Sequence, residues 1–157
     1  NLELESTDPL PGGRHYKVGL TYNLKKGIKY DIEDMEAEFD SIETINAIKQ
    51  ALERLNLNVE LLEADNNIVT HLVQSKPDIV FNIAEGFNGR GREAHVPALL
   101  NFLNIPFTGS DETTLCIALD KALTKRILST FGVKTPKFQL IEHPSEYTLK
   151  LDFPLIA

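Results

Sequence analysis

The residues best suited to chemistry lie in one short segment between Asp78 and Ser110. It contains ionisable side chains interleaved with glycines, in the order Glu85, Gly86, Gly89, Arg90, Gly91, Arg92, Glu93 and His95. A short apolar run precedes them and a helical pattern follows, and open parallel sheets place ligands at such strand ends. Glycines before a helix also leave backbone N–H groups free to face an anion. The segment therefore indicates a small-molecule or anion site, and a solvated surface loop is the alternative.

The motifs and the composition exclude several classes of ligand but do not identify one. The order Gly86-x-x-Gly89-x-Gly91 differs from the dinucleotide fingerprint G-x-G-x-x-G, and no P-loop lysine motif occurs. With 16 basic and 23 acidic residues the net charge is −7, which argues against a nucleic-acid partner. No apolar run approaches the roughly 20 residues of a membrane span. We expect a cytoplasmic protein with no membrane partner, in which the single Cys116 is a small buried hydrophobe.

Strand and helix patterns alternate along the chain. Strands are predicted at 17–22, 58–63, 78–84 and 105–108, and helices at 41–55, 66–74, 94–103, 111–118 and 120–131. Such alternation predicts an α/β fold with a Rossmann-like parallel sheet flanked by helices. Asp40 is the expected N-cap of the first helix, with Glu43 as its capping-box partner. In the third helix, Leu99, Leu100, Phe102 and Leu103 are the expected core side.

Three regions are expected along the 157 residues. We predict that residues 1–15 form an N-terminal extension and that residues 16–132 form the α/β domain. Gly132 stands at the C′ position, directly after the last predicted helix of that domain. Two further strands, Lys137–Ile141 and Phe153–Ala157, follow when that sheet is complete. We interpret residues 133–157 as the start of a second domain, and the chain as a fragment or ordered part of something longer.

Several segments together resemble a known family. They are NIAEGFNGRGREAHVPALLNFLNIPFTGSD, LDKALTK (Leu119–Lys125), GVKTP (Gly132–Pro136) and FPLIA. In this order they resemble the D-alanine–D-alanine ligase group of the ATP-grasp superfamily, from about Tyr16 to Ala157. The resemblance implies a pre-ATP-grasp domain that binds the first amino acid, followed by the first strands of a truncated ATP-grasp domain. It also implies joining of two amino acids through an acyl-phosphate with ATP and Mg²⁺, a role in peptidoglycan biosynthesis, and a homodimer.

The resemblance also assigns residues. Lys121 matches the lysine that reaches ATP phosphates, and Lys125 lies one helical turn further on. Glu85, Gly86 and Arg92 fall at substrate-binding positions, and either Glu36 or Glu38 matches the glutamate that binds the substrate amine. The magnesium ligands and most ATP-binding residues are expected beyond Ala157.

The glycine segment departs from the family pattern in its charges. Glu85 stands where strict D-alanine–D-alanine ligases have a histidine, and Gly91-Arg92-Glu93-Ala94 stands in place of Gly-Glu-Asp-Gly. A carboxylate in place of histidine reverses the charge preference for an approaching substrate carboxylate. Arg92 could restore it through a bidentate pair.

Two functions remain open. The first is the amino-terminal part of an ATP-dependent carboxylate–amine ligase. The second is a non-catalytic Rossmann-like module that binds a small ligand. A receiver-like signalling domain is disfavoured, because Thr21-Tyr22 and Ala84-Glu85 stand where its aspartates would be.

Overall fold

The computed structural model describes residues 15–27, 36–143, 145 and 148–153. Its elements are β1 (Lys17–Tyr22), α1 (Ile42–Glu53), β2 (Asn58–Glu63), α2 (Ile68–Ser75), β3 (Ile79–Asn82), a 3₁₀ turn η1 (Arg92–Ala94), α3 (His95–Phe102), α4 (Glu112–Leu119) and α5 (Lys121–Thr130). The order confirms the predicted α/β class. Among the described residues, no helix has both the length and the apolar character needed to cross a membrane.

The strands form a parallel sheet in the order β2-β1-β3. Leu20 in β1 lies opposite Leu61 of β2 and Phe81 of β3, so the carboxyl ends of all three strands meet at one edge. Outside β3 the sheet continues only as a single bridge, from Val80 to Phe107. The strand predicted at 105–108 is therefore reduced to that bridge in the described part of the chain.

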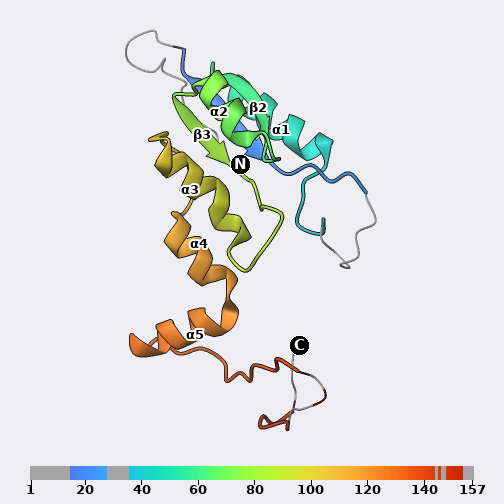
Figure 1. The fold of residues 1–157 in the computed structure, drawn as a ribbon, viewed down its shortest axis with the longest axis vertical. Helices are drawn as coiled ribbons and strands as arrows, with labels where there is room; N and C mark the ends of the chain where they lie inside the picture. The colour runs from blue at the N-terminus through green and yellow to red at the C-terminus, as the bar shows by residue number, and fades with distance from the viewer. Residues whose placement is uncertain (1–14, 28–35, 144, 146–147, 154–157) are drawn as a thin grey trace, which may run out of the picture.

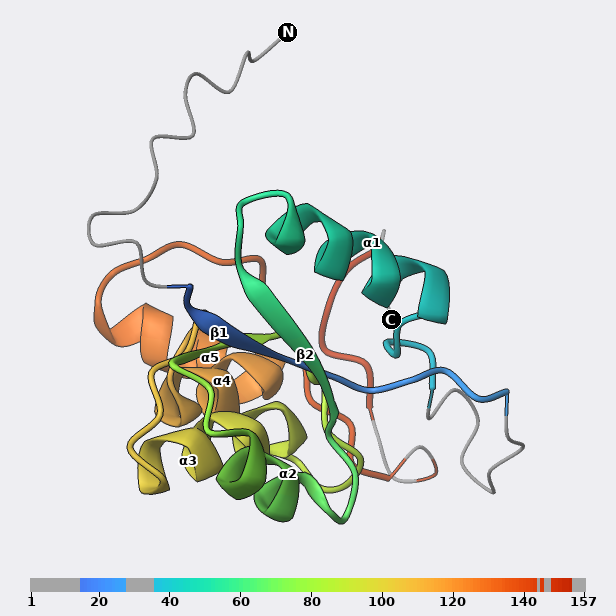
Figure 2. The ribbon, with the colours of Figure 1, turned by 90° about the horizontal axis from the view of Figure 1, so that it is seen from above.

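Helices cover both faces of the sheet (Figure 2). On one face α1 contributes Ile45 to a buried cluster with Val18, Leu20, Tyr22 and Val59. On the other face α2 and α3 bury Ile68, Leu72, Val96 and Leu100 against Leu62 and Val80. Gly19 faces this second layer, where an added Cβ would lie 2.7 Å from Leu62 Cδ1. The two-residue alternation of the strands thus supplies both layers.

Two local predictions are wrong. The N-cap of α1 is Ser41, whose hydroxyl accepts from the Thr44 amide at 3.3 Å, and not Asp40. Asp40 instead forms a backbone bridge with Leu24, which holds it beside the segment that follows β1. Phe102 is 86% exposed and not part of the core. It stands two positions after the fully buried Leu100, which rotates it about 200° around the helix.

The last helices extend away from the sheet. In Figure 1, α4 and α5 follow α3 down the molecule, and Gly132 has the positive φ of +71° expected after a helix end. Cys116 in α4 is exposed, contrary to the expectation that it would be buried. Residues 137–141 form no strand, since no described segment pairs with them. Phe153–Ala157 lies mostly outside the described residues, and the domain boundary at residue 132 stays a prediction.

Candidate functional site

Asn23, the residue after β1, ties together the carboxyl ends of the sheet. Its side chain is 1% exposed, and its Oδ1 accepts hydrogen bonds from the backbone amides of Glu85 and Gly86, both at 2.8 Å. Its Nδ2 donates to the carbonyl of Ala64, directly after β2, at 3.1 Å. One buried amide therefore fixes the start of the glycine segment relative to both other strands.

A second polar network holds the end of β3. The hydroxyl of Thr21 donates to Asn82 Oδ1 at 2.7 Å, and the same oxygen accepts from the Ala84 amide at 3.3 Å. The Asn82 amide in turn donates to the Thr108 hydroxyl at 3.2 Å. Sequence reasoning missed Thr21, Asn23 and Asn82. The available signal was a polar residue at or just after the ends of β1 and β3.

The glycine segment folds back on its own far end. Gly86 has a φ of +72°, and an added Cβ would lie 2.3 Å from the Arg92 carbonyl oxygen. Only glycine satisfies both the dihedral angle and the close approach. An added Cβ on Gly91 would lie 2.8 Å from Cys116 Sγ, so the segment also packs against α4. Residues near 85 and near 92 are thereby held side by side.

This fold-back gathers four of the predicted substrate-binding residues. Glu38, Glu85 and Glu93 each place a carboxylate oxygen within 4.8 Å of the others. The Arg92 guanidinium donates to Glu38 Oε2, linking the glycine segment to the residues before α1. Gly86 lies next to Glu85 in the same segment. We call Glu38, Glu85, Arg92 and Glu93 the charged cluster.

The charged cluster is acidic on balance. Burial raises the pKa of Glu85, and the neighbouring Glu93 and Glu38 raise it further, against the opposing charge of Arg92. Three carboxylates with one guanidinium favour a ligand that brings a cationic group. Carboxylate oxygens also suit Mg²⁺ or Ca²⁺. Because Arg92 already pairs with Glu38, however, this donor set fits an ammonium group better than a divalent metal.

Glu36 and Glu38, the two alternatives for the amine-binding position, lie in different settings. Glu36 is 7% exposed, and its Oε2 accepts from the backbone amides of Lys26 at 3.0 Å and Gly27 at 2.7 Å. Its Oε1 is buried without a hydrogen-bond partner among the described residues. Glu36 therefore holds the backbone at residues 26–27, whereas Glu38 joins the charged cluster.

A second ion pair connects the glycine segment to α5. The Arg90 guanidinium donates to Asp120, which caps α5 by accepting from the Leu123 amide at 2.9 Å. The Leu123 hydrogen bond, and then Arg90, lower the pKa of Asp120. The predicted phosphate residue Lys121 therefore begins a helix whose cap is tied to the glycine segment.

Lys121 and Lys125 make separate contacts. Lys121 Nζ donates to the Ala118 carbonyl at 3.2 Å and is exposed. Lys125 Nζ donates to the Pro136 carbonyl at 2.8 Å and lies 5.3 Å from the centre of the Phe138 ring. The described residues do not bring the two lysines to a shared partner.

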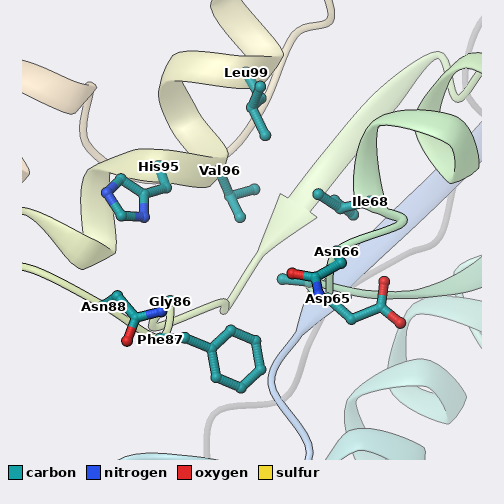
Figure 3. Close-up of a pocket in the computed structure, with 10 residues that line it drawn as sticks. Asp65, Asn66, Ile68, Gly86, Phe87, Asn88, His95, Val96 and Leu99 are labelled. Atoms are coloured by element: carbon teal, nitrogen blue, oxygen red, sulfur yellow. The ribbon is translucent and has the colours of Figure 1, made fainter.

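A cavity of about 570 Å³ adjoins the glycine segment on the α2 and α3 side of the sheet (Figure 3). Its lining comes from the end of β2 and start of α2 (64–66 and 68), from residues 86–88, and from the start of α3 (95, 96 and 99). The apolar lining residues are Ala64, Ile68, Phe87, Val96 and Leu99, and the polar lining residues are Asp65, Asn66, Asn88 and His95. Sequence reasoning did not foresee this cavity, because its walls come from three separate segments.

The sequence is similar to those of known proteins over 63–71% of its length. It is 36% identical over 99 residues to the D-alanine–D-alanine ligase of Aquifex aeolicus, covering 63% of the chain and 33% of that protein. It is 37% identical over 101 residues to the corresponding ligase of Zymomonas mobilis, covering 64% of the chain and 31% of that protein. The uncharacterized protein y4sG of Sinorhizobium fredii is 32% identical over 120 residues, covering 71% and 36%. No family model matches the chain.

The fold is also similar to that of a solved ligase. The D-alanine–D-alanine ligase of Bacillus anthracis, crystallised with ATP, superposes with a TM-score of 0.57 at 20% identity. The match covers 79% of the chain and 37% of that structure. The chain thus spans about a third of the length of the curated relatives it matches. These likenesses confirm that the chain is a distant homologue of the amino-terminal part of the D-alanine–D-alanine ligases of the ATP-grasp superfamily.

Proposed function

We propose that the chain is the amino-terminal part of an ATP-dependent ligase that joins two amino acids through an acyl-phosphate. The observation that carries the proposal is the 36% identity to a D-alanine–D-alanine ligase over 99 residues. The position of the charged cluster supports it, since open parallel sheets bind ligands at the carboxyl ends of their strands. In this proposal the chain supplies substrate binding, and the complete protein performs the reaction.

The charged cluster would hold the first amino acid. Arg92 offers the planar guanidinium that pairs with a carboxylate, and in this proposal the substrate carboxylate would share Arg92 with Glu38, its present partner. Glu85 and Glu93 would take the ammonium group, with Gly86 allowing the close backbone approach behind them. Glu36 would act indirectly, by holding the backbone of Lys26 and Gly27 in place.

The nucleotide would be bound mainly outside this chain. ATP would supply the phosphoryl group that activates a substrate carboxylate, with Mg²⁺ held by residues of the ATP-grasp domain beyond Ala157. Lys121 is the residue of this chain that we assign to the phosphates. Its exposed position at the start of α5 supports that role, because a lysine there can act as a point charge.

The cellular setting follows from the same proposal. Use of ATP points to the cytoplasm, and D-alanine as the substrate would place the product in peptidoglycan biosynthesis. The homodimer implied by the family resemblance is part of the proposal. The substitution of Glu85 for the family's histidine makes the identity of the amino acid the first question to test.

The test is phosphate release from ATP by the complete protein, across a panel of D- and L-amino acids. Release stimulated by D-alanine would establish a D-alanine–D-alanine ligase, and release with another amino acid would keep the mechanism and change the substrate. A folded sample that binds ATP and releases no phosphate with any amino acid would favour the non-catalytic binding module.

Arg92→Ala tests the assignment within the cluster. Loss of a charge-assisted bidentate pair costs roughly 1.5–3 kcal/mol, so we expect KM for the amino acid to rise at least about tenfold. Arg54→Ala is the matched control, because Arg54 is exposed at the end of α1, which leads to the opposite edge of the sheet. Equal kinetics for the two variants would remove Arg92 from the site.

A further inference from the structure

The cavity beside the charged cluster has the position and lining of a side-chain pocket. We propose that it takes the apolar side chain of the amino acid substrate, of leucine size or larger, while the charged cluster holds the backbone groups. This inference rests on the proposed function, and it names a class of substrate that excludes alanine as the preferred one.

The lining supports an apolar occupant. Ile68 and Val96, which are 7% and 4% exposed, form part of the floor together with Leu99. Asn66 and Asn88 are exposed at the rim on opposite sides, as Figure 3 shows. An apolar floor with a few polar groups around the opening is the usual composition of a small-molecule pocket.

The size of the cavity argues against a methyl group. A volume of about 570 Å³ lies within the roughly 300–1,000 Å³ of pockets that hold drug-sized ligands. An alanine side chain would leave nearly all of it to water. A leucine or phenylalanine side chain would cover the exposed parts of Phe87 and Leu99, which are both only partly buried.

The cavity and the charged cluster are parts of one framework. Gly86 lines the cavity and directly follows Glu85, and His95 lines it two residues after Glu93. Asn23 strengthens the connection, because it binds the amides of Glu85 and Gly86 and also the carbonyl of Ala64, another lining residue. The charged cluster and the cavity wall thus share the backbone at residues 85–86 and 93–95, and in this proposal the substrate spans the two.

Two measurements on the complete protein test the inference. The first is phosphate release with glycine, alanine, leucine and phenylalanine, the last three in both stereochemical forms. A single methylene in an apolar pocket changes kcat/KM by roughly 10–200-fold, so we expect leucine or phenylalanine to exceed alanine at least about 100-fold. The second is calorimetric binding of the same amino acids without ATP, which does not depend on catalysis.

A matched pair of variants links these readouts to the cavity. Asn66→Trp places an indole at the rim, whereas Thr70→Trp adds the same group at an exposed position of α2 outside the lining. We expect Asn66→Trp to weaken binding of leucine and phenylalanine at least about tenfold, and by more than it weakens alanine. Thr70→Trp should bind all of them as the unmodified protein does, which also controls for effects of tryptophan on folding.

The outcomes separate the pocket from the ligase proposal. Fastest phosphate release with glycine or alanine, with the two tryptophan variants alike, would overturn the pocket and leave the ligase intact. Phenylalanine binding that Asn66→Trp abolishes, without phosphate release by any amino acid, would support the pocket and overturn the ligase. Absence of calorimetric binding by every amino acid would overturn the pocket.

Discussion

Asn23→Ala should loosen the carboxyl edge of the sheet more than any exposed substitution nearby. The change removes three hydrogen bonds, two from the amides of Glu85 and Gly86 and one to the Ala64 carbonyl. Each is worth about 1 kcal/mol, and the side chain is 1% exposed, so water cannot readily replace it. We expect a loss of about 3 kcal/mol in the free energy of opening at this edge.

Hydrogen exchange measures this loss directly. A change of about 3 kcal/mol corresponds to an increase of more than about 100-fold in the exchange rates of the Glu85 and Gly86 amides. Asn88→Ala is the control, since Asn88 is exposed in the same segment and should change stability by less than about 0.5 kcal/mol. If Asn23→Ala loses less than about 1 kcal/mol and leaves those two amides protected, Asn23 does not hold the edge as argued.

Three further substitutions test other parts of the structure. In urea unfolding, Gly86→Ala should destabilise the protein by at least about 2 kcal/mol more than Gly89→Ala. Both glycines have a positive φ, but only at Gly86 would an added Cβ collide with backbone atoms. Equal losses of stability would contradict this packing. Glu85→Gln should stabilise the protein at pH 7. The pKa of Glu85 is raised in the folded protein, so the protonated carboxyl favours folding below the ordinary pKa of 4.5, and this benefit is lost as pH rises through the folded pKa. The neutral amide of glutamine does not lose it. Unfolding midpoints of the unmodified protein and Glu85→Gln should thus converge at low pH, and a constant difference would count against the pKa shift. Ser41→Ala should reduce the free energy of unfolding by about 1 kcal/mol through loss of the α1 cap. A larger effect from Asp40→Ala would instead support Asp40 as the N-cap, as predicted from the sequence.

The layout of the sheet was predictable because its signals are local. The strands 17–22 and 58–63 were predicted with the bounds that the structure has, since each is a short segment with apolar residues set apart from the helical patterns around it. The glycine segment was likewise found between a strand and a helix. Gly86 was assigned to the site by resemblance, and its physical reason, the approach of the Arg92 carbonyl, appeared only in the structure.

The remaining features depend on contacts between distant residues. The strand predicted at 137–141 has apolar residues, but a strand needs a hydrogen-bonded neighbour, and the described chain offers none there. The choice between Asp40 and Ser41 depended on the bridge to Leu24, which no local pattern reveals. The separation of Glu36 from Glu38 in role has the same origin, because both are glutamates in one polar stretch.

The hydrogen bonds of Asn23 also bear on the order in which parts of the protein fold. They join residues 41, 62 and 63 positions apart in the sequence, so each closes a long loop of chain. All three can be present together only when β2 and β3 have both paired with β1. The framework of the charged cluster should therefore be absent from the folding transition state, with φ-values near zero for Asn23. Substitutions there would then accelerate unfolding and leave the rate of folding nearly unchanged.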